Sequence, residues 1–430
     1  MNAPEQTDVL IAGGGPAGSL LACLLARRGV SVVLVEKETK LQRSFRGENI
    51  AARSVRTLRE LGFGPLLAEA GFLELTGVTV REDGKPLMHI DYGKFSLRTL
   101  PIDIPQPSLI GLFTEQARLH TNCTHLNGTT LTGLLEEDGA VVGATVRSAA
   151  SGTREIRARI VIGADGRFSR VRKRSGLPVD VQPMARDFLS FLVPRPEQWG
   201  QGAELVVSGD RHLVVLPTYP DMLRIGHNLP KRGLAELRAA GFPAFRESIA
   251  SLDPRLAPLV HAHLTSWDDT GFLEIFTAEM ERWTRNGLLL IGDASHTATP
   301  ILGQGVNLAI QDAVSVVPVL VRALATGSGP VPESALLDFV ADRKRHKQLV
   351  TRYQRMQEAS LSESRPARTR VRRARLRVLN ALPIKYRLLD KVINAPHPID
   401  PVDVQLGLAA ARIPAMRAPR DAELPTPVAG

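Results

Sequence analysis

Hydrophobic and polar residues follow two periods in this chain, and both occur within its first forty positions. A short apolar run comes first, then a glycine-rich turn, apolar residues at helical spacing, and a second apolar run that ends in an acid. These segments are Val9–Ala12, Gly13–Gly18, Ser19–Arg28, Ser31–Val35 and Glu36. The order strand, turn, helix, strand predicts the start of a parallel α/β sheet, because parallel neighbours need a crossover connection.

The glycines of the first turn have the spacing GxGxxG, at Gly13, Gly15 and Gly18. In a strand–turn–helix unit the first permits a tight turn, the second lets the backbone approach a pyrophosphate, and the third allows close helix–strand packing. The helix start adds unpaired N–H groups that suit a diphosphate. Glu36 stands where a carboxylate accepts from both ribose hydroxyls of an adenosine, which argues against a 2′-phosphate. The stretch predicts a dinucleotide site.

Two later apolar strands also end in glycine and aspartate. Their sequences are Ile160–Ile162 followed by Gly163-Ala164-Asp165-Gly166, and Leu288–Ile291 followed by Gly292-Asp293. Ligands of open α/β sheets bind outside the carboxyl ends of the strands, so Asp165 and Asp293 are candidate ligand contacts. After Asp293, a loop with Pro300 and Gly303 opens a long apolar helix, whose first N–H groups can hold negative charge. In this loop we interpret His296 as a structural histidine rather than a catalytic base.

The rest of the chain divides into further helices, hairpins and a region of short strands. Helical spacing marks Ile50–Leu61 and Leu112–His120, hairpin turns fall at Asp83-Gly84 and Asp138-Gly139, and residues 334–358 and 385–393 are amphipathic. Between 186 and 277, short strands separated by Pro and Gly indicate a second, mixed lobe. We therefore predict an α/β fold in four parts. They are a discontinuous Rossmann-like nucleotide-binding domain (1–80, 100–185 and 280–333), an interleaved mixed-sheet substrate domain (81–99 and 186–279), a C-terminal helical region (334–410) and a flexible tail (411–430).

The cysteines, the first residues of the chain and the histidines indicate which compartment and which kinds of site to expect. Two cysteines, Cys23 and Cys123, cannot support a disulfide framework, so we expect a reducing cytoplasm. No leader precedes the first strand, and we expect no transmembrane helix. His261 and His263 have no acid or cysteine at ligand spacing, so we expect no metal site.

The net charge of +10 owes much to one arginine-rich stretch, residues 365–377. Such a run can bind nucleic acid or an anionic membrane surface. It lacks interleaved aromatic residues and a nucleic-acid-binding motif, so we expect no nucleic-acid partner. We favour a solvated helix face with Val371, Leu376 and Val378 inward, which leaves a weak membrane-surface contact open.

Together, GxGxxG with Glu36, the Gly163–Gly166 turn, and Gly292-Asp293 with Pro300 and Gly303-Gln-Gly305 resemble the signature set of single-component FAD-dependent aromatic hydroxylases, the p-hydroxybenzoate hydroxylase-like family. The resemblance implies FAD as cofactor, with Arg46, Pro300 and Gly303 beside the flavin. It implies that Asp165 assists both FAD and the passing nicotinamide cofactor, and that Asp293 holds the ribitol. The implied FAD contacts are Gly13, Gly15, Pro16, Ala17, Gly18, Glu36, Lys37, Arg46, Gln116, Arg118, Asp165, Gly166, Gly292, Asp293, Pro300, Gly303, Gly305, Val306 and Asn307. One departure is visible, because Thr114–Gln116 stand where the family often has Arg or Gln.

The resemblance also implies a reaction: NADPH or NADH reduces the flavin, oxygen forms a C4a-hydroperoxide, and one oxygen atom is inserted into the substrate. We expect an aromatic or polycyclic, mainly hydrophobic small molecule, in natural-product tailoring or aromatic catabolism. Candidate pocket residues on the short strands are Phe191, Leu216 and His227. Two alternatives stay open. One is an FAD-dependent reductase or epoxidase of an isoprenoid double bond, and the other a flavin-containing protein that binds nucleic acid or a membrane surface.

Overall fold

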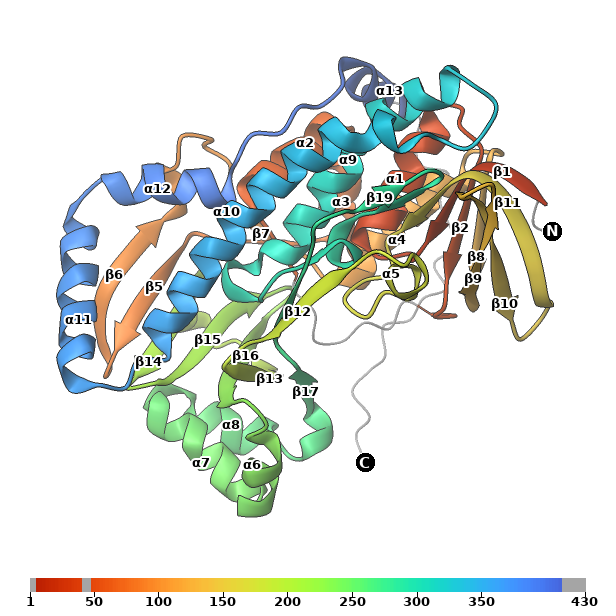
Figure 1. Cartoon of the computed structure of the whole chain (residues 1–430). Coiled ribbons are helices and arrows are strands. Elements are labelled where there is room, and N and C mark those ends of the chain that lie inside the picture. The colour runs from red at the N-terminus through yellow and green to blue at the C-terminus, as the bar shows by residue number, and fades with distance from the viewer. Residues whose placement is uncertain (1–4, 41–47, 412–430) are drawn as a thin grey trace.

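The structure, a computed structural model, describes residues 5–40 and 48–411 of the chain. Arg46 and the expected tail from 412 onward therefore lie outside the described residues. Figure 1 shows two lobes, one built on a mainly parallel sheet and the other on a second sheet with three helices beneath it. A long helix, α10, crosses from one lobe to the other.

The first sheet has eight strands and follows the predicted α/β pattern. β1 pairs in parallel with β2 and with β11, so Val9 lies between Val32 and Ile160. The strands are β1 (Gln6–Ala12), β2 (Val32–Glu36), β8 (Cys123–Asn127), β9 (Thr129–Glu137), β10 (Ala140–Ser148), β11 (Gly152–Gly163), β19 (Thr284–Arg285) and β20 (Leu288–Leu290). The central strands are apolar along the segments that are buried, such as Val9–Ala12 of β1 and Ile160–Ile162 of β11.

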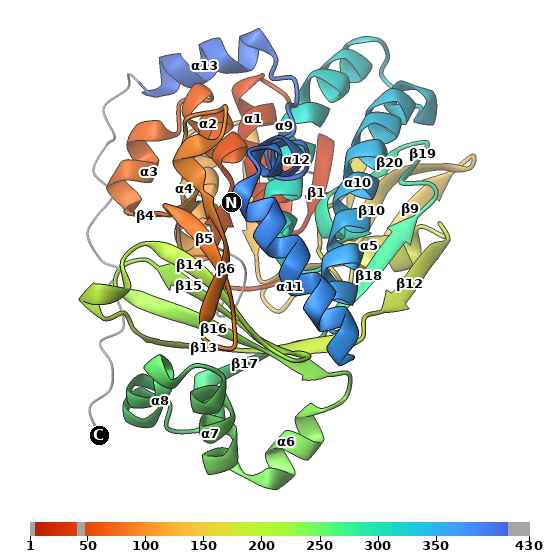
Figure 2. The same cartoon turned by 90° about the vertical axis from the view of Figure 1, so that its left-hand side faces the viewer.

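The second sheet has seven strands in the order β17-β13-β16-β15-β14-β5-β6. These are β5 (Gly77–Glu82), β6 (Lys85–Asp91), β13 (Arg186–Pro194), β14 (Gly202–Ser208), β15 (Arg211–Thr218), β16 (Met222–Pro230) and β17 (Thr270–Leu273). β5 joins it in parallel with β14 from its first residue, Gly77, so the predicted boundary at residue 81 falls inside a strand. Figure 2 shows α6, α7 and α8 below this sheet and the other lobe above it.

Two small sheets connect the lobes. They are β3 (Asn49–Ile50), β7 (Ile102–Asp103) and β4 (Leu73–Glu74), and β12 (Val179–Pro183), β18 (Phe276–Met280) and β21 (His296–Thr297). The helices are α1 (Pro16–Arg27), α2 (Ala52–Glu60), α3 (Gly64–Ala70), α4 (Gln106–Arg118), α5 (Arg170–Arg174), α6 (Leu234–Ala240), α7 (Phe242–Leu252), α8 (Ala257–His263), α9 (Gln304–Ala325), α10 (Leu337–Leu361), α11 (Pro366–Ala381), α12 (Ile384–Ile393) and α13 (Pro401–Ala411).

Two helices correct the sequence analysis. α4 begins at Gln106, six positions before the predicted Leu112, because Pro107 lies in its first turn, where proline costs no hydrogen bond. In α11, Val371 and Val378 are 67% and 59% exposed, so the prediction that they point inward was wrong. The helix instead buries Thr369 and Arg372.

The helix Ile301–Ala325, which includes α9, is long and apolar enough to cross a membrane, but 61% of its most apolar window is buried within the fold. That burial is typical of a core helix. Its residues pack with α1 in the main hydrophobic core.

Candidate active site

The three motif turns meet at the carboxyl edge of the first sheet. A Cβ added to Gly13 would lie 2.5 Å from the carbonyl oxygen of Ala164, so the first turn touches the second. A Cβ on Gly292 would lie 3.4 Å from Cβ of Ala17, so the third turn touches the start of α1. The predicted convergence of these distant segments is therefore present in the fold.

The first turn is held to the end of β2 by Glu36. The buried Glu36 carboxylate accepts a hydrogen bond of 2.7 Å from the amide of Gly14 and one of 3.0 Å from the amide of Glu38. A carboxylate oxygen can accept more than one hydrogen bond, so these bonds are compatible with the predicted ribose contact. Its neighbour Lys37 is exposed and pairs with Glu38, so its side chain points to solvent.

Two of the helices that follow the motif turns begin without a side-chain cap. α1 starts after Gly15 and α9 after Gly303, and neither glycine can offer an oxygen to the first N–H groups. Both starts lie at the same edge, because Asp293 Oδ1 would be 3.9 Å from a Cβ on Gly305 while Gly292 lies against Ala17. Uncapped helix starts fit a ligand with negative charge at two separated points, as FAD carries on its diphosphate and on its reduced ring.

The helix after the second turn is capped by the protein itself. Asp165 accepts hydrogen bonds from the Ser169 hydroxyl and from the amides of Arg170, at 2.6 Å, and Val171, at 3.1 Å. Burial raises the pKa of Asp165 above its usual range, against these hydrogen bonds. The Asp165 side chain therefore caps the start of α5. Its expected contact with FAD and the nicotinamide cofactor stays a prediction.

Arg172 ties the second turn to the third. Its buried guanidinium donates to the carbonyl oxygens of Asp293, at 3.2 Å, and Ala294, at 2.9 Å. The same Asp293 carbonyl also accepts from the Thr297 hydroxyl at 3.0 Å. These bonds fix the backbone of Asp293, while its carboxylate lies toward the start of α9.

The loop before α9 has an unusual backbone. Leu302 has φ = 63° and Gly303 has φ = 59°, so two consecutive residues are left-handed. Asn307, expected beside the flavin, has its amide side chain engaged within the protein. It accepts from the amide of Ala51 at 2.8 Å and donates to the carbonyl oxygens of Asn49, at 3.2 Å, and Gly303, at 2.9 Å. Asn307 thus joins β3 to the start of α9, and only its backbone is left for a cofactor contact.

Behind this loop lies a buried ionic cluster that sequence analysis missed. Asp312 accepts from Arg343 at 2.8 Å, from Lys347 at 2.6 Å and from the amide of Gly292 at 2.7 Å. Burial acts to raise the pKa of Asp312, but the two cations outweigh it and leave that pKa below its usual value. Burial lowers the pKa of Lys347, which also lies 4.5 Å from the ring centre of Trp283.

His296 lies in the same loop, beside this ionic cluster, and the structure supports its structural role. Its Nε2 lies 2.7 Å from the Thr351 hydroxyl, and the ring is buried. Burial lowers the pKa of His296 to about 3, so the imidazole is neutral.

The structure does not bring Gln116 and Arg118 to the carboxyl edge. α4 precedes β8, and β8 runs parallel to β2 with Cys123 opposite Val32. α4 must therefore end near the amino edge, so its last residues lie away from Glu36. The residue at the carboxyl edge is Gln106, at the buried start of α4. A proline one position after a glutamine, typical of a first helical turn, was the signal that could have found it.

Two of the three candidate pocket residues point away from the site. In β13, Leu189, Phe191 and Val193 pack into the hydrophobic cluster that includes α7 and α8, and the ring centre of Phe191 lies 5.9 Å from that of Phe245. His227 lies on the same face, 6.1 Å from Phe245, and burial lowers its pKa to about 4. Strand alternation placed both beneath the sheet, so this prediction was wrong.

The opposite face of the second sheet lies toward the other lobe (Figure 2). Leu216, the third candidate, is on this face, because it pairs with Arg224 rather than with the residues buried against α7. Arg224 donates to Glu48 at 2.5 Å and so joins the two lobes beside β3. Asp103, on β7, lies nearby; burial, with the charge of Glu48, raises its pKa to about 7.

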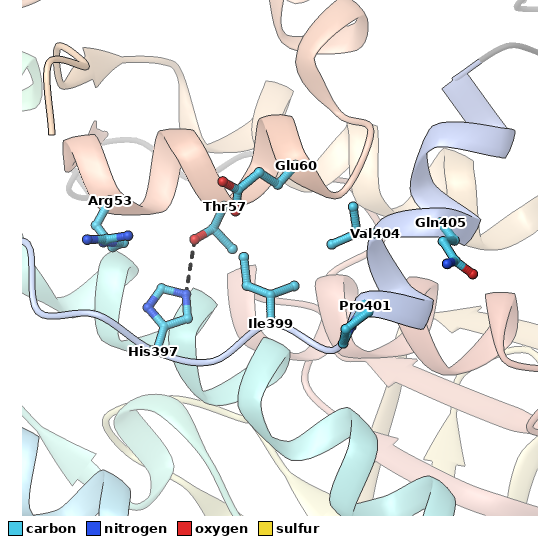
Figure 3. Close-up of a pocket in the computed structure, with 8 residues that line it drawn as sticks. All are labelled: Arg53, Thr57, Glu60, His397, Ile399, Pro401, Val404 and Gln405. Carbon is cyan, nitrogen blue, oxygen red and sulfur yellow. Dashed lines mark hydrogen bonds between the residues drawn. The ribbon is translucent and has the colours of Figure 1, made fainter.

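A surface hollow of about 500 Å³ lies elsewhere, between α2 and the segment that leads into α13. Figure 3 shows His397 pointing to Thr57, whose hydroxyl lies 3.0 Å from the imidazole Nε2. The hollow is lined by Arg53, Thr57, Glu60, His397, Ile399, Pro401, Val404 and Gln405. None of these belongs to the motif turns, so the hollow is separate from the candidate active site.

The fold and the two helix starts that follow glycine turns define a dinucleotide-binding α/β protein, and comparison with known proteins specifies its family. Residues 6–354 match the FAD binding domain family. The chain is 37% identical over 360 residues to 6-methylpretetramide 4-monooxygenase of Streptomyces rimosus, which covers 82% of this chain and 84% of that protein. It is 29% identical over 350 residues to 12-dehydrotetracycline 5-monooxygenase/anhydrotetracycline 6-monooxygenase of S. rimosus subsp. rimosus, covering 78% of this chain and 66% of that one.

A solved structure agrees with these relatives. P. aeruginosa PqsL in complex with 2-aminobenzoylacetate superimposes with a TM-score of 0.75 at 25% identity, covering 88% of this chain and all of that chain. The chain therefore belongs to the FAD binding domain family and, within it, to the p-hydroxybenzoate hydroxylase-like monooxygenases. It is an FAD-dependent monooxygenase, as the sequence predicted.

Proposed function

We propose that this enzyme hydroxylates a ring carbon of a mainly hydrophobic, polycyclic aromatic molecule in natural-product tailoring. The observation that carries the proposal is the position of the face of the second sheet opposite α6–α8, which lies toward the other lobe. Its Arg224 pairs with Glu48, and the next residue, Asn49, lies against Gly303 at the start of α9. The 37% identical relative is named as a monooxygenase of 6-methylpretetramide, which supports a polycyclic substrate.

The residues on that face support a largely apolar wall with few polar groups. Apolar side chains come from Phe188, Leu192, Val214 and Leu216, which are half-buried and alternate with the residues packed against α7. Arg224 and Arg186 are charged groups on this face, and each is paired with a carboxylate, Glu48 and Asp210. Such a wall suits flat ring systems and orients them through a small number of polar atoms.

FAD, when bound, supplies the electron transfer and oxygen activation, with NADPH or NADH as donor. In the proposal, the chain's own residues bind the cofactor and keep water out. The amides at the starts of α1 and α9 would stabilise negative charge, Glu36 would bind the ribose, and Asp293 would bind the ribitol. The apolar wall would exclude water from the reacting rings. Arg46, outside the described residues, is proposed beside the flavin.

We test this with the purified full chain. Its absorbance spectrum should show bound FAD, and a screen of polycyclic phenols should find one that accelerates NAD(P)H oxidation with matching oxygen uptake. The product should be heavier by one oxygen atom. A gain of two hydrogens without oxygen uptake would show a reductase instead, and a colourless protein that does not take up FAD would refute the proposal.

We further propose a cytoplasmic enzyme that touches anionic membrane surfaces through α11 and α12. Both cysteines are free, which suits a reducing compartment. In Figure 1 these two helices form one outer edge of the molecule. Large apolar side chains are exposed along them and form an apolar stripe, in which helical spacing puts the first two on one side of α11. These side chains are Val371, Val378, Leu382, Ile384 and Leu388.

Charge complementarity favours an anionic bilayer as the occupant of this stripe. No acidic residue occurs between 365 and 389. Within residues 5–40 and 48–411, no ion pair engages the arginines beside the stripe, Arg370, Arg375, Arg377 and Arg387. A basic helix with an exposed apolar face is typical of binding at a lipid surface.

Cosedimentation with vesicles containing phosphatidylserine tests this contact. Each arginine near an anionic surface contributes about 1 kcal/mol, so Arg375→Glu with Arg377→Glu should abolish binding. Val181→Asp, an exposed site on β12, is the matched control and should bind normally. Equal binding to neutral vesicles, or a dimer that Val378→Asp separates in solution, would refute the membrane contact.

A further inference from the structure

α10 carries a row of buried polar residues on the side that faces the loop between β20 and α9. Arg343, Lys347, Thr351 and Gln354 are spaced by four, four and three positions, so they share one face of the helix. Arg343 pairs with Asp312 on α9, and from Lys347 onward the partners follow the order of the loop. Lys347 donates to the Ser295 hydroxyl at 3.1 Å, Thr351 contacts His296, and Gln354 contacts residues 299–301.

Gln354 makes the last and densest of these contacts. Its Nε2 donates to the carbonyl oxygens of Thr299, at 3.0 Å, and Ile301, at 2.7 Å. Its Oε1 accepts from the amide of Thr299 at 3.3 Å. The side chain is fully buried, so no water can replace these bonds without entering the core.

The segment that Gln354 holds leads directly into the two left-handed residues. A bulky residue such as Leu302 disfavours φ = 63°, and such a conformation persists only where its surroundings hold it in place. Gln304 contributes by donating to the Leu302 carbonyl at 3.0 Å. On the other side, the three bonds of Gln354 fix the backbone immediately before Leu302.

We infer that Gln354 is a positioning residue for the flavin site, because it sets the path of residues 299–303 and so the direction of the first α9 amides. It touches neither cofactor nor substrate and acts only through this backbone. The inference rests on the proposed use of the α9 start by FAD. It adds a residue from a helix that contains none of the FAD motifs.

The test replaces Gln354 by methionine, which keeps the length of the side chain and removes its polar atoms. Two quantities are measured: the dissociation constant of FAD added to apoprotein, and the hydrogen-exchange rate of the amides of residues 299–304 in the apoprotein. Gln354→Met should weaken FAD binding about tenfold and accelerate exchange in this segment, because the loop loses its fixed path.

Asn122 offers a matched control on the opposite edge of the sheet. Its Nδ2 also donates to two backbone carbonyls, those of Ala26, at 3.1 Å, and Val30, at 2.7 Å. Asn122→Leu should lower the melting temperature as Gln354→Met does, yet leave the FAD dissociation constant and exchange in 299–304 as in wild type.

Wild-type values for both readouts in Gln354→Met would overturn the inference, and so would an equal loss of FAD affinity in Asn122→Leu. If the methionine variant does not fold, Gln354→Asn, which keeps a neutral amide but is one methylene shorter, is judged by the same readouts. Failure of the wild-type protein to bind FAD would refute the proposed function itself, so the two failures are distinguishable.

Discussion

The two sides of the loop between β20 and α9 are built in opposite ways. On the side of the motif turns, glycines remove side chains and two helices start uncapped, so backbone donors stay open. On the side of α10, the side chains of Arg343 and Lys347 pair with Asp312 in a buried cluster. The difference indicates a division of labour, in which one side binds and the other prevents movement.

The largest expected effect comes from a substitution in the buried cluster on the side of α10. Asp312→Asn removes the only carboxylate that the structure shows between Arg343 and Lys347, and leaves two cations buried without their partner. We expect a loss of about 3–5 kcal/mol in the free energy of unfolding, measured by urea denaturation.

Asp342→Asn is the matched control, because Asp342 pairs with Arg345 in an exposed pair on the same helix. It should leave the urea midpoint unchanged, since exposed pairs contribute little. Equal midpoints for the two variants would contradict a structural role for the buried cluster.

A second effect concerns how the free energy of unfolding depends on pH. Asp103 has a pKa of about 7 in the folded protein, raised by burial and by Glu48, against an ordinary value of 3.8. The folded state therefore holds an extra proton between about pH 4 and 7, and this group makes the free energy of unfolding fall as pH rises through that window. The slope is at most about 1.4 kcal/mol per pH unit.

His296 has the opposite sign. Its folded pKa of about 3 lies below the ordinary 6.5, so its contribution is present at neutral pH and is lost as pH falls from 6.5 toward 3. Asp103→Asn, which keeps an acceptor for the Tyr219 amide, should remove the Asp103 slope and leave the acid-side loss. Urea denaturation of both proteins from pH 4.5 to 8 measures this; parallel curves would show that Asp103 does not titrate in that window.

A smaller effect tests the side of the motif turns, where backbone donors stay open (the open side). Gly18→Ala places a Cβ 2.0 Å from the carbonyl oxygen of Gly13, so α1 must move away from β1. We expect a loss of about 1–3 kcal/mol in stability and at least tenfold weaker FAD binding. Gly111→Ala in α4, with no atom within 4 Å of the new Cβ, should be neutral or stabilising. Thermal melts measure the stability of both variants, and FAD titration measures their affinity. Unchanged FAD affinity in Gly18→Ala would contradict FAD binding on the side of the motif turns.

The sequence predicted the open side well because its chemistry depends on local spacing. Gly13, Gly15 and Gly18 can be recognised from their positions alone, and so can the strands that end in Asp165 and Asp293. The relatives confirm the family and the FAD-dependent monooxygenase reaction that this spacing indicated.

The α10 side could not be predicted, because its polar residues have the spacing and composition of a solvated helix face. Only the fold shows that Gln354 and Lys347 are buried. The same limit applies to β13, where alternation fixes two faces but not which one α7 covers, so Phe191 was assigned to the wrong one. Gln106 was missed because the helix was predicted to begin only at Leu112, whereas α4 begins at Gln106 with Pro107 in its first turn.

The parallel pairing of β5 with β14 has a consequence for how the chain is made. Gly77 pairs with Gly202, and β1 waits for its neighbour β11 until residue 163 has been synthesised. A nascent chain on the ribosome can pair β1 with β2 and β5 with β6 early, but one edge of β1 and one of β5 stay unpaired while well over a hundred further residues are added. Such late closure folds slowly and exposes strand edges to aggregation, so chaperone supply should limit the yield of this enzyme in a foreign host.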